Sequence, residues 1–211
     1  MFKLRNDVVL NHALVSRRPL DSGAFAVRAT LLHVFGEAGD HDVLILRDGR
    51  LRERFSVTVQ PGGAPTQVNI DLAGPLADGY SVRAGGVVGF YAAQGRERYA
   101  VVVKRAAPGQ TQTVLDSRER LPVNDLFAVI LVHPGTYRAR NLLNRTELRA
   151  AVRMPRRGEA YDPAQPTLIL AGEQGFEPEA AQILAGQSLV LLARTPARFV
   201  VELEEAAPDK P

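Results

Sequence analysis

One stretch of this sequence occurs twice with a period of about 100 residues, which is too long for a solenoid repeat and matches a whole small domain. Residues 84–104 and 185–204 both begin with Ala-Gly and continue through a short apolar segment. Both then cross a turn that contains arginine and end in an alternating strand led by an aromatic residue, Tyr99 or Phe199. We therefore expect a tandem duplication.

The repeat suggests boundaries for the two copies. We expect copy 1 at residues 16–105 and copy 2 at residues 117–205, followed by a tail at 206–211. Residues 106–116 are polar with Pro and Gly, which is typical of a linker. Residues 1–15 contain a short apolar run, and we expect it to form an extra strand that adds to a sheet edge or crosses to the other copy.

The pattern inside each copy is that of short strands. Phe55, Val57 and Val59 alternate with polar residues, which indicates a strand with one buried face. Asp48-Gly49 between apolar runs predicts a hairpin turn, since both residues tolerate a positive φ. Residues 177–184 are the one helical candidate, interpreted as a single helical turn or a loop. The expected core residues are Phe25, Phe55, Val57, Tyr99, Val101, Phe127, Val152, Phe199 and Val201.

Six to eight short strands in each copy favour an all-β protein made of two tandem, homologous antiparallel β-sandwich domains. Two short segments add a resemblance to a known family. Gly175-Phe176-Glu177-Pro178, followed by Ala185-Gly186-Gln187, resembles the first strands of cupredoxins, and Pro134-Gly135-Thr136-Tyr137 resembles their PGTY strand. The copper-binding cysteine of that family is missing. The resemblance therefore implies a cupredoxin-like or immunoglobulin-like sandwich without the metal.

The composition excludes several kinds of chemistry. The chain has no cysteine, so disulfides, thiolate metal sites and cysteine nucleophiles are excluded. The net charge of +3 does not by itself indicate nucleic acid. The N-terminus lacks the pattern of a secretion signal, and no run is long enough to span a membrane. These features favour a cytoplasmic or virion-associated protein, and the abundance of Arg, Ala, Leu and Val suggests a bacterial or phage gene.

Two histidines end apolar strands that we align between the copies, His33 and His133. One interpretation is a metal or proton-transfer site used twice, because imidazole is a common ligand and titrates near neutral pH. The preferred interpretation is an inherited residue that caps a strand, because a metal site needs three or four suitably spaced ligands.

Residues 37–42 form a second candidate metal site. Asp40, His41 and Asp42 supply oxygen and nitrogen atoms that could hold a cation. The segment lacks the spaced ligands of a calcium loop, so a solvated acidic turn is the preferred interpretation. We expect no cofactor.

Arginine is concentrated in residues 138–157. Arg138 and Arg140 share one strand face, as do Arg149 and Arg153, and pairing of the two strands would align four guanidinium groups on an exposed sheet face. Such a face could bind a polyanion, an acidic glycan or an acidic protein surface. The alternative is a solubilising surface. Aromatic stacking residues are sparse there, which does not favour single-stranded nucleic acid.

The sequence contains no recognisable catalytic motif. We therefore expect a non-enzymatic binding or structural protein that pairs with another protein or with itself as a subunit of a larger assembly. The main alternative is a carbohydrate-binding or polyanion-binding module that uses the arginine face. A second alternative is a metal-dependent enzyme that uses His33, His41 and nearby acids.

Overall fold

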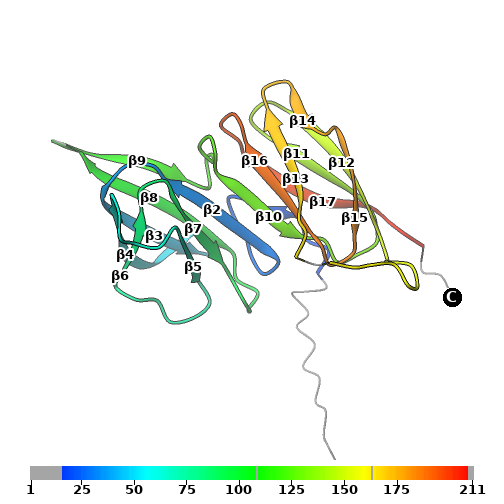
Figure 1. The fold of residues 1–211 in the computed structure, drawn as a ribbon, viewed down its shortest axis with the longest axis horizontal. Coiled ribbons are helices and arrows are strands. Elements are labelled where there is room, and N and C mark those ends of the chain that lie inside the picture. Colours follow the sequence, from blue (N-terminus) through cyan, green and yellow to red (C-terminus); the bar gives the residue numbers. More distant parts are fainter. Residues whose placement is uncertain (1–15, 108, 163, 209–211) are drawn as a thin grey trace, which may run out of the picture.

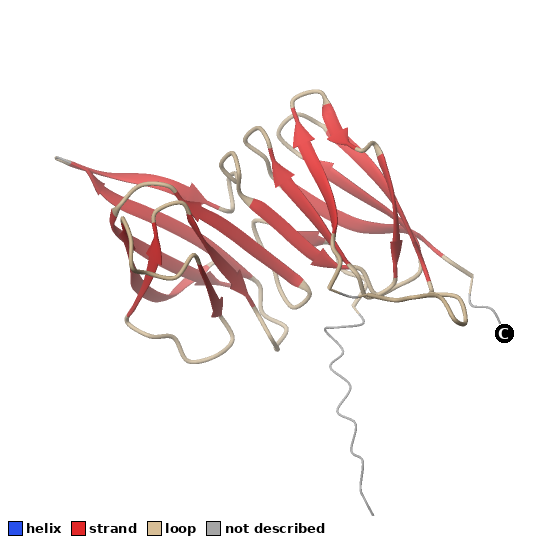
Figure 2. Cartoon of the chain, in the orientation of Figure 1, coloured by secondary structure: helices blue, strands red, loops and turns tan. Residues whose placement is uncertain are grey.

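The structure is a computed structural model that describes residues 16–107, 109–162 and 164–208. Within these ranges the regular secondary structure consists of β-strands alone, which confirms the expected all-β class (Figure 2). The strands form one seven-stranded sheet and two five-stranded sheets. The extra strand expected within residues 1–15 falls outside the described residues.

The seven-stranded sheet passes through both halves of the chain. Near its centre β2 and β10 pair antiparallel, with Leu31 opposite Phe127, and this pairing joins the halves side by side (Figure 1). The two halves therefore share one continuous sheet, a connection that the repeated sequence did not indicate. In spatial order its strands are β14 (Gly175–Glu177), β13 (Thr167–Gly172), β16 (Ser188–Ala193), β10 (Leu126–Ile130), β2 (Ala29–Phe35), β7 (Gly86–Tyr91) and β5 (Gln67–Asp71).

Each five-stranded sheet belongs mainly to one half of the chain. The sheet of the first half contains, in spatial order, β6 (Gly79–Arg83), β4 (Arg50–Gln60), β3 (Gly39–Arg47), β8 (Tyr99–Ala107) and β9 (Gln110–Asp116). The sheet of the second half contains β1 (Leu20–Asp21), β17 (Phe199–Ala206), β11 (Gly135–Asn141), β12 (Thr146–Arg153) and β15 (Ala180–Leu184).

The hydrophobic core lies between these layers. Alternation in β4 buries Phe55, Val57 and Val59, as the sequence predicted, because successive side chains of a strand point to opposite faces. All nine expected core residues are buried. They belong to one cluster that draws apolar side chains from all three sheets. The burial of apolar area between sheets is the main term that stabilises such a fold.

The order of strand pairing recurs in the two halves. In the first half β3 pairs with β4 and β8, β4 runs parallel to β6, and β7 pairs with β2 and runs parallel to β5. In the second half β11 pairs with β12 and β17, β12 runs parallel to β15, and β16 pairs with β10 and runs parallel to β13. Each half therefore contains two parallel strand pairs, and these pairs occupy corresponding positions in the two halves.

Short strands also cross between the halves. β1 precedes the first half but pairs with β17, while β9 precedes the second half but pairs with β8. Asp21 on β1 forms an ion pair with Arg198 at 2.7 Å. A Cβ atom on Gly23 would lie 2.4 Å from the Arg198 guanidinium carbon, so a larger residue there would displace the Arg198 side chain. β1 and β9 therefore connect the two halves at the edges of the five-stranded sheets.

Local expectations for the turns had mixed outcomes. Asp48-Gly49 forms the turn between β3 and β4 with φ angles of 51° and 79°, which confirms the hairpin. In the expected linker at residues 106–116, residues 106 and 107 instead end β8 and residues 110–116 form β9, because polar residues suit a strand at a solvated sheet edge. The expected helical turn or loop at residues 177–184 is also wrong, because residues 180–184 form β15 beside β12.

Candidate docking face

The outer side of five adjacent strands in the seven-stranded sheet, from β13 to β7, is mostly apolar. Its inner side packs on the core, and the alternate residues point away from the core. In the described part of the chain, these outward residues neither belong to the core cluster nor pack against it. We call them the outer apolar face: Leu32, Val34, Val87, Leu126, Ala128, Ile130, Leu168, Leu170, Val190 and Leu192.

Strand register places four leucines of this face in one row. Leu170 lies opposite Leu192, Leu192 lies opposite Leu126, and Leu126 lies opposite Leu32. Neighbouring strands are about 4.8 Å apart, so the row crosses four strands over about 14 Å. Leu168, in the next row, is 50% exposed. The apolar residues are therefore contiguous and are not scattered singly over the surface.

The face differs from an ordinary solvated sheet surface. An antiparallel sheet with one wet side normally alternates apolar residues inward with polar residues outward. The five strands β13, β16, β10, β2 and β7 contain no Asp, Glu, Lys or Arg. Contiguous apolar patches larger than a few hundred Å² mark interaction sites on soluble proteins. The chemistry of this face therefore suits contact with another apolar surface.

The four candidate arginines lie on the outer side of β11 and β12, as expected. Arg138 lies directly opposite Arg149, and the side chains of Arg138 and Arg149 are 33% and 70% exposed. The neighbouring strand β17, however, places two carboxylates beside them. Arg140 pairs with Glu202 at 2.9 Å, and Arg138 approaches both Glu202 and Glu204.

The rest of the group is also paired. Arg149 Nε lies 4.0 Å from Glu204, and Arg153 forms an ion pair with Glu159 at 2.5 Å. Hydrogen bonds from Arg153 and from the Arg156 backbone N–H lower the pKa of Glu159 to about 2. The four guanidinium groups thus share a sheet side, and each lies within ion-pair distance of a carboxylate of the same chain. Glu202 and Glu204 lie on β17 of the same chain and balance the arginines locally.

His33 forms a buried pair that the sequence did not reveal. Its Nδ1 atom lies 2.8 Å and 2.9 Å from the two oxygens of Asp125, and the backbone N–H of Val34 donates to the same carboxylate. The His33 side chain is 6% exposed and that of Asp125 is 1% exposed. Asp125 immediately precedes β10, so this pair links the two halves beside the central strand pair. Its geometry indicates a structural role.

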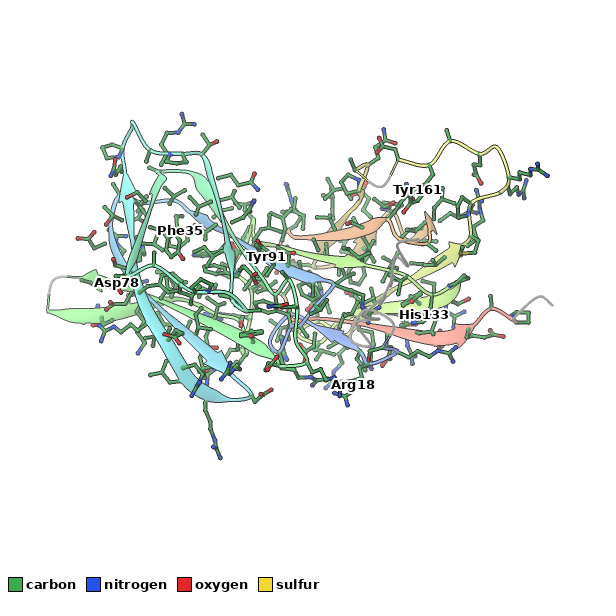
Figure 3. All side chains as sticks on the ribbon, turned by 90° about the horizontal axis from the view of Figure 1, so that it is seen from below. Arg18, Phe35, Asp78, Tyr91, His133 and Tyr161 are labelled. Carbon is green, nitrogen blue, oxygen red and sulfur yellow. The ribbon has the colours of Figure 1, made fainter. Side chains whose placement is uncertain are left out.

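His133 does not occupy the position of His33. The Gly85 N–H donates to the Phe35 carbonyl, and the Gly186 N–H donates to the Leu131 carbonyl. These matching bonds align Phe35 with Leu131, which puts Val129 in the place of His33. His133 lies in the loop between β10 and β11. In Figure 3 it is also far from Phe35, which lies two residues from His33 on β2. The expected equivalence of the histidines is therefore wrong.

The segment 37–42 does not converge on a cation. His41 is buried beside the Phe35 ring, whereas Asp40 and Asp42 lie on the other side of β3. Asp42 pairs with Arg54 at 2.9 Å, and Asp40 accepts a hydrogen bond from Thr58. Within residues 16–107, 109–162 and 164–208, no group of three or more His, Cys, Asp and Glu side chains is arranged to hold a metal ion.

The outer apolar face was missed at the sequence level, although a signal for it exists. Residues 126–132, 168–171 and 189–193 are unbroken apolar runs. Such runs are typical of strands that are buried on both sides, whereas strands with one solvated side alternate. The runs therefore indicate a second covered side, which the described part of the chain does not supply.

Comparison with known proteins found no matching family model, no matching curated protein and no matching solved structure. The described residues contain no helix that is long and apolar enough to cross a membrane.

Proposed function

We propose that this protein is a non-enzymatic structural subunit that associates with a second copy of itself through the outer apolar face. The observation that carries the proposal is the uncharged, contiguous side of five adjacent strands. Face-to-face packing of two sheets about 10 Å apart is the usual way in which such a surface is removed from water. A second copy always presents the matching flat surface, so an isologous dimer requires no other partner.

The chain itself offers one other occupant, residues 1–15. The apolar run within them is Val8–Val15, which is interrupted by Asn11 and His12. A run of this size has the length of one strand and would cover about one of the five strands. A second copy covers all five, so it accounts better for the extent of the face.

We also propose that the two halves arose by duplication of one immunoglobulin-like or cupredoxin-like sandwich, with residues 16–105 and 117–205 as the two copies. The recurring order of strand pairing supports this proposal, as do the matching hydrogen bonds of Gly85 and Gly186. Before the duplication, two molecules of the single domain would have dimerised by pairing the same strand from each molecule. That strand corresponds to β2 in the first half and to β10 in the second half. Self-association through sheets would then be an old property of the fold.

Polyanion binding by the arginines of β11 and β12 receives less support from the same structure. Glu202 and Glu204 lie among these arginines and reduce the local positive potential. Phosphate polymers depend on uncompensated Lys and Arg for affinity. The charge balance therefore favours a solvated surface at this place.

The oligomeric state of the full chain tests the proposed function. Light scattering coupled to gel filtration should give about twice the chain mass of 22.9 kDa at micromolar concentration. Leu126→Glu places a charge at the centre of the face and should give a monomer that remains folded. The matched control is Ala151→Glu, at an exposed outward position of β12, and it should remain dimeric.

Two results would contradict the proposal. One is a monomeric wild-type protein at about 100 μM, a concentration at which contacts of ordinary interface size are populated. The other is a dimer that Leu126→Glu leaves intact. Removal of residues 1–15 distinguishes the two occupants: dimerisation should persist, and its loss would assign the contact to that segment.

A further inference from the structure

A cavity of about 250 Å³ lies between the chain that enters the first half and the loop that joins β7 to β8. Arg18 and Arg28 contribute to its lining from the first segment, and Arg96 and Arg98 contribute from the loop. Figure 3 labels Arg18 at the lower edge of the molecule, between the two halves. The cavity is separate from both the outer apolar face and the arginines of β11 and β12.

Backbone contacts hold the two walls of this cavity together. Phe25 and Tyr99 exchange hydrogen bonds of 3.0 Å and 2.7 Å, which brings the loop beside the entering chain. The Asp48 N–H donates to the Arg98 carbonyl, and the Asp48 carboxylate accepts from the Arg98 N–H. The positions of the lining arginines are thus determined by regular structure on either side.

The positive charge of the lining has little opposition nearby. Asp21 is the one carboxylate that lines the cavity, and Arg198 from the second half already pairs with it. Glu97 lies between two lining arginines in sequence, but its carboxylate accepts from the backbone N–H of Arg96. Among the described residues, no carboxylate lies within ion-pair distance of the guanidinium groups of Arg18, Arg28, Arg96 or Arg98.

Arg28 is the most unusual of these residues. It is 8% exposed, its φ angle is 76°, and its Nε atom is buried without a hydrogen-bond partner. One Nη atom donates to the Ser16 carbonyl at 2.6 Å. A left-handed conformation is rare for a side chain of this kind and often marks a functional position. Burial lowers the pKa of Arg28, while Tyr137 opposes this shift.

A buried guanidinium usually lies beside an anion, because an unpaired buried charge loses its hydration without compensation. The planar fork of arginine matches the oxygens of carboxylate and phosphate groups. Pro19, Leu20 and Val27 add apolar surface to the same cavity. Most small-molecule sites combine an apolar wall with a few converging polar groups.

We propose that this cavity binds a small organic anion, with a phosphate or carboxylate group against Arg28, Arg96 and Arg98 and an apolar body against Pro19, Leu20 and Val27. The cavity of about 250 Å³ is slightly smaller than typical ligand sites of about 300–1,000 Å³, so the ligand should be small.

Thermal shift and isothermal titration calorimetry on the full chain test the proposal with four probes: inorganic phosphate, phenyl phosphate, benzoate and sodium chloride at matched ionic strength. Phenyl phosphate or benzoate should stabilise the protein more than sodium chloride does, and whichever binds more tightly identifies the head group. Phenyl phosphate should bind at least about tenfold more tightly than inorganic phosphate, because only the former fills the apolar part. Equal binding of these two would overturn the apolar component.

Substitutions locate the binding. Arg96→Gln and Arg98→Gln change exposed side chains, so the variants should fold, and each should weaken binding by about tenfold, the effect of losing one charge-assisted hydrogen bond. Arg28→Gln should abolish binding if it folds. The matched control is Arg52→Gln, an exposed arginine of β4, which should bind like the wild type. Absence of any stabilisation beyond that of sodium chloride, or undiminished binding in both loop variants, would overturn the proposed site.

Discussion

The outer sides of two sheets in this protein are built on the same alternation but have opposite chemistry. On β11, β12 and β17 the outward positions hold arginines and glutamates that pair across strands, as in Arg140 with Glu202. On β2, β10 and β16 the outward positions hold Leu32, Leu126 and Leu192 in one row. Both sheets bury their inner sides in the same core. The two sheets therefore differ in the residues of their outer sides and in the surroundings that those residues suit.

On the charged side, the arginines are balanced within one chain, because carboxylates on neighbouring strands lie beside them. The apolar side has no such internal compensation in the described part of the molecule, since an apolar side chain is satisfied only when another surface removes it from water. The comparison teaches that the chemistry of the outward residues separates the solvated side from the side that we propose to dock.

The largest expected effect compares the core with the outer apolar face. Phe199 is fully buried, so Phe199→Ala should lower the free energy of unfolding by about 3–5 kcal/mol. Leu32→Ala, measured in the Leu126→Glu background to keep the protein monomeric, should cost under about 1 kcal/mol, because Leu32 lies outside the core. Urea denaturation measures both values. A cost for Leu32→Ala as large as that of Phe199→Ala would show that the face is already covered within the monomer.

The second prediction compares the buried His33–Asp125 hydrogen-bonded pair beside the central strand pair with an exposed ion pair elsewhere. Asp125→Ala leaves His33 and the Val34 N–H buried without their acceptor, which should cost about 3 kcal/mol. Asp42→Ala removes an exposed pair with Arg54 and should cost about 0–1 kcal/mol. Chemical denaturation of the two variants measures the two losses in the free energy of unfolding. Equal costs would mean that burial does not separate the two kinds of pair.

The third prediction concerns the charged side itself. Replacing Arg138, Arg140, Arg149 and Arg153 with Gln removes exposed or half-exposed ion pairs, so the free energy of unfolding should fall only slightly. Self-association should be unchanged, because these residues lie away from the outer apolar face. Retention on heparin at low salt should change little, since the glutamates already balance the arginines. A large loss of retention would restore the polyanion-binding interpretation.

The smallest expected effect concerns pH. Burial lowers the pKa of His41, whereas the hydrogen bond to the Gly39 carbonyl opposes the shift. Below the ordinary histidine value of about 6.5 the unfolded chain takes up a proton that the folded protein resists, so stability should fall as the pH falls from about 7 to 5. His41→Gln should flatten this slope. Glu159 on the charged side, whose pKa falls from the ordinary value of 4.5 to about 2, should reduce stability mainly below about pH 5. An identical slope in the variant would contradict the assignment to His41.

Local patterns in the sequence predicted several strands and their inner sides. Alternation at Phe55, Val57 and Val59 predicted a strand and its buried face, because side-chain direction in a strand depends only on position. The Asp48-Gly49 turn was predictable for a similar reason, since its positive φ angles depend on the residues themselves. These features require no knowledge of distant parts of the chain.

Tertiary structure decided which strands became neighbours, and with it every candidate site. The glutamates of β17 balance Arg138 and Arg140 only because β17 pairs with β11, although more than 60 residues separate them. His33 meets Asp125 only where β2 pairs with β10. The sequence determined the direction of each side chain along its strand. Contacts between strands depend on the whole topology, because distant segments meet only when the complete chain buries its common core.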